Sequence, residues 1–96
     1  MRIEFAQGAR TELKAATNWY VRQAGSAVAQ LFRSEVRTLV ELLAGQPAIG
    51  AQTVGGARFV VLKRFPFSVV YRQAGDVLVI LAIAHHKRRP GYWVRK

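Results

Sequence analysis

The sequence contains no cysteine, which excludes a disulfide framework and a metal site built on thiolates. Acidic residues are nearly as scarce: there are five, of which four lie in the first half and Asp76 falls in an expected turn. This distribution disfavours catalysis by paired carboxylates. The two histidines, His85 and His86, are adjacent, so on an extended chain they point to opposite faces and do not share one ion. We therefore expect no metal and no cofactor.

Long apolar runs are also lacking. The longest uninterrupted run, residues 77–84, is far shorter than the roughly 20 residues that cross a bilayer. The first residues lead into a strand-like segment without the apolar core of a signal peptide. From these absences we expect a cytoplasmic protein with no membrane partner.

What the sequence has in excess is positive charge. Fifteen lysines and arginines give a formal net charge of +10 at pH 7. Residues 49–96 carry nine basic residues and one acidic residue, so the charge is concentrated in the second half. A field of this sign favours an anionic partner. With 96 residues, the chain is expected to form a single domain over residues 1–96 with a small core.

Hydrophobic periodicity predicts two helices near the N-terminus. Apolar residues recur at helical spacing over 9–24 and again over 28–43. Gly25 is expected to end the first helix, and Ser26 to cap the start of the second. The second helix is expected to end at Gly45, with Pro47 beyond it, so the two form a helical hairpin.

The remaining pattern predicts strands. They are expected at 3–6, 57–63, 67–72 and 77–84, with a loop at 46–56 and a tight turn at 73–76. The order β-α-α-β-β-β indicates an α+β two-layer fold in which the helical hairpin packs on a mainly antiparallel sheet. Because residues 77–84 are apolar throughout, we expect a central strand buried on both faces. The helices suffice to cover only one face of the sheet, which leaves the other for a partner.

Three segments follow one another in the second half: FPFSVVYR at 65–72, AIAH at 82–85 and RRPGYW at 88–93. In this order and spacing they resemble the RelE/ParE superfamily of toxins from type II toxin-antitoxin systems, closer to the ParE branch. The resemblance covers nearly the whole chain, including the helical hairpin.

The resemblance implies a plasmid-stabilisation type toxin that blocks DNA gyrase by binding, without covalent chemistry of its own. It also implies neutralisation by a cognate antitoxin with an acidic, amphipathic C-terminal segment, in a toxin-antitoxin hetero-oligomer. The expected target-binding residues are His85, His86, Lys87, Arg88, Arg89, Tyr92 and Trp93. The expected antitoxin-binding residues are Arg58, Arg72, Trp19 and Tyr20.

One alternative is a ribosome-dependent mRNA endonuclease of the RelE type. Cleavage of RNA without a metal needs a base, cations for the charged phosphorane and an acid. His85, Arg72 and Tyr92 could supply these groups. Ser68, however, stands where such nucleases commonly carry an arginine. A further alternative is a nucleic-acid-binding module without catalysis.

The same residues also have structural explanations. His85 at the end of an apolar strand could cap the core through a hydrogen bond. Tyr92 and Trp93 could pack back on the helices and anchor the end of the chain. The basic residues 87–89 could form a solvated turn.

Overall fold

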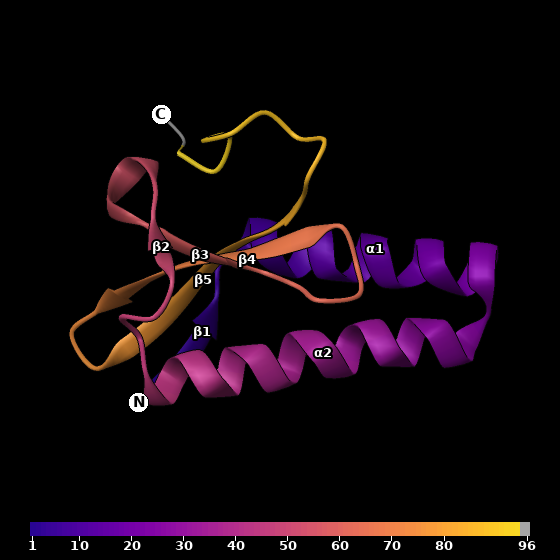
Figure 1. The fold of residues 1–96 in the computed structure, drawn as a ribbon, viewed down its shortest axis with the longest axis horizontal. Helices are drawn as coiled ribbons and strands as arrows, with labels where there is room; N and C mark the ends of the chain where they lie inside the picture. Colours follow the sequence, from indigo (N-terminus) through magenta and orange to yellow (C-terminus); the bar gives the residue numbers. More distant parts are fainter. Residues whose placement is uncertain (95–96) are drawn as a thin grey trace.

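The computed structural model describes residues 1–94 and places two helices against one five-stranded sheet (Figure 1). The helices are α1 (Gln7–Ala24) and α2 (Ser26–Gly45). The strands are β1 (Arg2–Phe5), β2 (Ala51–Gln52), β3 (Arg58–Val61), β4 (Phe67–Ala74) and β5 (Val77–His85), and a short 3-10 helix, η1 (Val54–Gly56), follows β2. The strand order is β1-β5-β4-β3-β2. The predicted α+β two-layer fold is confirmed.

A single residue joins the two helices. Gly25 has a φ of 94°, a conformation that favours glycine, and its N–H donates to the Val21 carbonyl oxygen at 3.1 Å. The prediction that Gly25 ends α1 is therefore confirmed. The prediction that Ser26 caps α2 is wrong: Ser26 is the first residue of α2, and Gly25 occupies the N-cap position without a side-chain cap. The hairpin is too tight for a separate capping residue.

The β4–β5 hairpin forms the middle of the sheet. Its pairing runs antiparallel from Phe67 and His85 to Ala74 and Val77, and the turn uses Gly75 at a φ of 63°, as expected. On its other side β5 pairs with β1 in parallel, which the sequence pattern did not predict. With a strand on each side, β5 is an internal strand, as predicted, but the expected burial on both faces is complete only over residues 82–84, since Val77, Val79 and Leu81 are partly exposed.

The largest local error of the sequence prediction lies between α2 and β4. The predicted strand 57–63 is shorter and spans Arg58–Val61, and the predicted loop 46–56 contains β2 and η1. Strand β2 is two residues long and exposed, and it forms by pairing with β3. So short a strand carries no periodicity, which explains why the sequence did not reveal it.

An irregularity in the hairpin decides which face the apolar residues of β5 occupy. Val70 pairs with Ala82 but the next residue, Tyr71, pairs with Ile80, so Leu81 is an extra residue in β5. Such a bulge reverses the alternation of the strand beyond it. Ile80 and Ile83 consequently both face the helices, although they are separated by an odd number of positions.

The sheet separates two apolar clusters. The larger one lies between sheet and helices and includes Ala9, Ala16, Phe32, Val36, Val40, Leu43, Leu62, Phe67, Val69, Tyr71, Leu78, Ile80 and Ile83. The smaller one lies on the opposite face and contains Ala57, Val70, Ala82 and Ala84, with Phe59, Leu81, Tyr92 and Trp93 packed against it. Figure 1 shows α2 on one side of the sheet and the C-terminal segment, in yellow, on the other. The chain thus covers part of its second face itself.

Tyr71 connects the sheet to the loop after α2. Its side chain is fully buried, its hydroxyl donates to the Pro47 carbonyl oxygen at 2.8 Å, and it accepts the Gly50 N–H at 2.9 Å. The Arg58 guanidinium also donates to the Gly50 carbonyl oxygen at 2.8 Å. The loop is therefore held by two side chains from neighbouring strands.

We predict that Gly50→Ala destabilises the fold by about 1–3 kcal/mol, as overpacking typically does. A Cβ at this position would lie 2.5 Å from the Tyr71 hydroxyl oxygen and 3.0 Å from the Phe59 carbonyl oxygen. Gly45→Ala is the matched control, because a Cβ there meets nothing within 4 Å. Urea unfolding measures both, and equal stability of the two variants would contradict the role of the loop.

Candidate functional site

Residues 86–94, called the C-terminal tail below, leave β5 through tight turns. The His86 N–H donates to the Pro66 carbonyl oxygen and the Arg88 N–H donates to the His85 carbonyl oxygen, both at 2.9 Å. Gly91 adopts a φ of 82°, which allows a further reversal. The predicted target-binding residues 85–89 therefore lie at the His85 end of the β4–β5 hairpin, and Tyr92 and Trp93 turn back over the face of the sheet that carries Ala82 and Ala84.

His85 has a structural role at the start of this segment. Its Nδ1 accepts the Lys87 N–H at 3.0 Å, and its ring meets the Phe67 ring edge-on at a centroid distance of 4.9 Å. A nitrogen that accepts a hydrogen bond carries no proton, so a neutral His85 is the Nε2–H tautomer here. The neighbouring His86 is exposed, with its Nε2 3.3 Å from the Ser68 hydroxyl oxygen.

Tyr92 and Trp93 anchor the tail on the second face of the sheet. Their rings meet at a centroid distance of 5.4 Å and pack on the cluster that contains Ala82 and Ala84. The expectation that both residues pack on the helices is thus corrected, since the helices occupy the other face. One contact to a helix does form: the Tyr92 hydroxyl donates to Glu12 Oε2 in α1 at 2.7 Å.

The environment of Tyr92 keeps its hydroxyl protonated. Burial raises the pKa of Tyr92, the hydrogen bond to Glu12 and the charge of Glu12 raise it further, and Arg88 lowers it. The Arg88 guanidinium lies 3.7 Å from the centroid of the Tyr92 ring. Trp93 Nε1 is buried and finds no hydrogen-bond acceptor among residues 1–94.

Positive charge is displayed on the outer side of the tail. Lys87, Arg88 and Arg89 are all exposed, but their surroundings differ. Arg88 stacks on Tyr92 and lies 3.5 Å from Glu12 Oε2. Lys87 and Arg89 are therefore the cations of this segment that are best placed to meet a partner.

The residues considered for RNA cleavage do not converge. Phe67 pairs with His85, and Arg72 lies five positions further along β4. At about 3.3 Å per residue, this separates Arg72 from His85 by roughly 17 Å along the sheet. Tyr92 lies near the His85 end, but its hydroxyl is bonded to Glu12.

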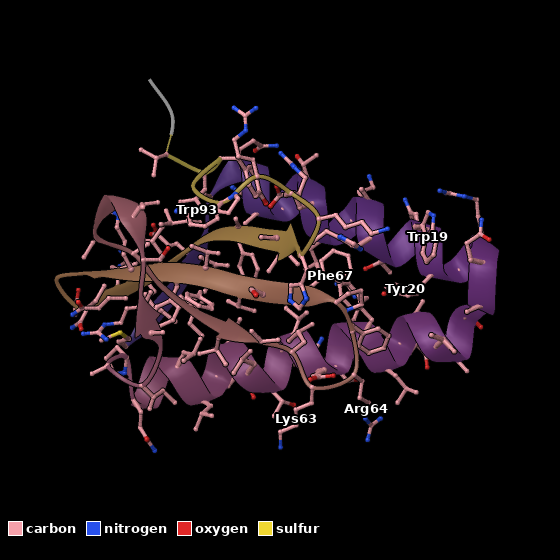
Figure 2. All side chains as sticks on the ribbon, turned by 45° about the horizontal axis from the view of Figure 1, so that its top comes forward. Trp19, Tyr20, Lys63, Arg64, Phe67 and Trp93 are labelled. Carbon is pink, nitrogen blue, oxygen red and sulfur yellow. The ribbon has the colours of Figure 1, made fainter. Side chains whose placement is uncertain are left out.

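The four expected antitoxin-binding residues lie at separate places. Arg58 pairs with Tyr71 and shares its face, whereas Arg72 is the next residue along β4 and points to the opposite face. Trp19 and Tyr20 lie near the junction of the helices (Figure 2). Trp19 is half exposed, while Tyr20 packs against rings that include Phe65 and Phe67.

An apolar groove that the sequence pattern did not predict lies between α2 and β3. It has a volume of about 500 Å³, and its large apolar side chains Leu31, Leu42 and Val61 are each about half exposed. The groove is lined by Leu31, Ser34, Glu35, Thr38, Leu39, Leu42, Val60, Val61, Lys63 and Arg64. The spacing of Leu31 and Leu42 places them on one side of α2, beside the buried stripe. The apolar residues of α2 therefore form a wider stripe than is needed to pack on the core. This extra width was the signal for the groove in the sequence.

Within the groove, α2 contacts the β3–β4 loop through Glu35. Glu35 accepts hydrogen bonds from the Lys63 N–H and, at 3.4 Å, from the Arg64 N–H. Figure 2 shows Lys63 and Arg64 beside α2. Their side chains place two cations at the rim of an apolar surface.

Neither a metal site nor a membrane span is found in the part of the chain that the structure describes. Residues 1–94 contain no group of three or more His, Asp and Glu side chains that could hold an ion. None of the helices in this range is long and apolar enough to cross a bilayer.

Comparisons with known proteins agree with the fold. Residues 3–90 match the family model of the ParE toxin of the type II toxin-antitoxin system, parDE. Among solved structures, the chain is similar to a chain of the chromosomal ParDE TA system from P. aeruginosa, with 30% sequence identity and a TM-score of 0.76. That match covers 88% of this chain and 95% of the other. No curated protein matches the sequence.

We predict that neutral His85 is the Nε2–H tautomer, because its Nδ1 accepts the Lys87 N–H. The 15N chemical shifts of the imidazole nitrogens distinguish the two tautomers in solution. A dominant Nδ1–H form would show that this hydrogen bond is absent and that His85 does not cap the turn.

Proposed function

Because the chain belongs to the ParE toxin family of type II toxin-antitoxin systems, we propose that it blocks DNA gyrase by binding and is held inactive by a cognate antitoxin. The observation that carries the proposal is the C-terminal tail, in which an apolar side is packed on the sheet and a basic side is exposed. Such an arrangement suits docking on a large anionic complex. Since gyrase is cytoplasmic, so is the proposed place of action.

Binding is favoured over RNA cleavage by the state of the candidate catalytic groups. His85 Nδ1 accepts a backbone hydrogen bond, and the Tyr92 hydroxyl donates to a carboxylate. Arg72 lies at the far end of the hairpin from His85. A metal-independent endoribonuclease would need these groups around one phosphate. The ribosome-dependent nuclease remains the second candidate.

We propose that the antitoxin inserts an amphipathic segment into the groove between α2 and β3. The half-exposed Leu31, Leu42 and Val61 would be buried by the apolar side of that segment. Lys63 and Arg64 at the rim, together with a net charge of +10, suit an acidic partner. An apolar groove with a charged rim is typical of surfaces that bind an amphipathic helix.

In this proposal the antitoxin also contacts the four residues expected from the sequence, which lie outside the groove. Trp19 and Tyr20 lie at the junction of the helices, and Arg58 and Arg72 lie on the two faces of the sheet. A single globular domain would not meet all four. An extended segment that wraps the toxin would.

The target is tested with purified toxin, gyrase and supercoiled DNA, scored for cleaved complex, beside a translating-ribosome assay for mRNA cleavage. We expect linearised DNA and intact mRNA.

Lys87→Glu with Arg89→Glu should lower gyrase poisoning by at least about tenfold, because reversal of two exposed cations costs more than about 1.4 kcal/mol of binding.

Lys14→Glu with Arg22→Glu is the control for this variant. Both residues are exposed on α1, and the change in net charge is the same. Retained poisoning by the tail variant would remove the tail from the target surface. Cut mRNA with unaffected gyrase would instead identify the endoribonuclease.

The antitoxin groove is tested by Leu42→Glu, measured as the rise in melting temperature on adding the cognate antitoxin. A partner that binds only the folded toxin stabilises it according to its affinity. Because the new carboxylate would be desolvated in the groove, the affinity should fall at least about tenfold.

Val21→Glu is the matched control: Val21 is exposed on α1 to nearly the same extent as Leu42, at 45% against 47%, and lies outside the groove. If antitoxin stabilised both variants equally, the groove would not be its binding site.

A further inference from the structure

Glu12 lies in α1 beside the end of β5 that β1 does not reach. The parallel pairing of β1 and β5 ends at Phe5 and Ile80, and one further bond joins the Ala6 N–H to the Ile80 carbonyl oxygen. Beyond this point β5 would present unpaired backbone groups. Glu12 Oε1 accepts the Ile83 N–H at 2.9 Å and thus takes the place of a strand partner.

The other carboxylate oxygen of Glu12 binds the C-terminal tail. Oε2 accepts the Tyr92 hydroxyl at 2.7 Å and lies 3.5 Å from a guanidinium nitrogen of Arg88. The Arg88 guanidinium in turn covers the Tyr92 ring at 3.7 Å. One side chain therefore connects α1, β5 and the tail, whose residues are some 70 to 80 positions away in sequence.

A carboxylate is suited to this position. It offers two oxygens with several lone pairs, so it accepts both hydrogen bonds without rearrangement. The Glu12 side chain is only 20% exposed, and Arg88 compensates its charge. The raised pKa of Tyr92 agrees with a phenol that serves as a donor to an ionised partner.

We propose that Glu12 is the positioning residue of the target-binding tail: it binds Tyr92 and Arg88 to α1 and so presents Lys87 and Arg89 to the target. The inference rests on the proposed function, in which the tail docks on gyrase. A tail held in place before binding avoids the entropic cost of ordering it in the complex. Arg88 then serves the toxin itself, and the contacts to the target come from its neighbours.

The test measures tail order and activity separately. Native trypsin digestion reports tail order, because Lys87 and Arg88 are cleavage sites, whereas Arg89 precedes Pro90 and is resistant. We expect Glu12→Ala to speed cleavage there about tenfold, since the tail loses the Tyr92 hydrogen bond and the Arg88 ion pair to a charged acceptor. The toxin concentration needed to trap gyrase should rise by a similar factor.

Three further variants make the test specific. Glu12→Gln should restore most of the protection, because its amide oxygen can accept the Ile83 N–H while its NH2 group donates to the Tyr92 oxygen. Tyr92→Phe removes the hydrogen bond between the tail and Glu12 but keeps the aromatic ring, so it should loosen the tail. This variant tests the proposal even if Glu12→Ala does not fold. Glu41→Ala removes an exposed glutamate of α2 and should leave the digestion unchanged.

The outcomes separate the positioning role from the proposed function. Tail protection that persists in both Glu12→Ala and Tyr92→Phe would overturn the proposal. A loosened tail with unchanged gyrase poisoning would also overturn it, because the tail would then need no positioning. If the unaltered toxin fails to trap gyrase, the proposed target is wrong, and the digestion still decides whether Glu12 holds the tail.

Discussion

The β4–β5 hairpin has two apolar faces, whereas the chain has helices for only one. The helices bury the face that carries Tyr71, Ile80 and Ile83, and the opposite face at Val70, Ala82 and Ala84 would otherwise meet water. The C-terminal tail covers this opposite face by packing Tyr92 and Trp93 on it. The position of the tail, and hence of the basic residues on it, follows from the need to cover a second apolar surface.

This packing divides the tail into an inner and an outer side. Tyr92, Trp93 and the ring of His85 are engaged with the protein itself, and Arg88 is engaged with Tyr92 and Glu12. Lys87 and Arg89 remain outside. The arrangement is that of an exposed cationic surface, and the groups that a nuclease would require around one phosphate lie apart. The chain belongs to the ParE toxin family of type II toxin-antitoxin systems.

Local patterns predicted much of this fold because they act over few residues. Helical periodicity located α1 and α2, alternation located β4, and Gly75 marked the hairpin turn. Features made by distant residues were missed. Strand β2 exists only through β3, the bulge at Leu81 appears only once β4 and β5 are in register, and Glu12 meets its partners across some 70 to 80 positions. No periodicity records such contacts.

The candidate site shows the same division. The sequence by itself determined the fold class and the concentration of positive charge, because composition and short-range order carry this information, whereas target binding by the segment 85–93 stays a prediction from the resemblance. Only the tertiary structure decided which of these side chains are free. His85 and Tyr92 are engaged in hydrogen bonds within the protein, and the register of the hairpin places Arg72 away from them. The packing of α2 beside β3 leaves Leu31, Leu42 and Val61 exposed in the groove. The roles of side chains depend on what surrounds them, and their surroundings come from long-range packing.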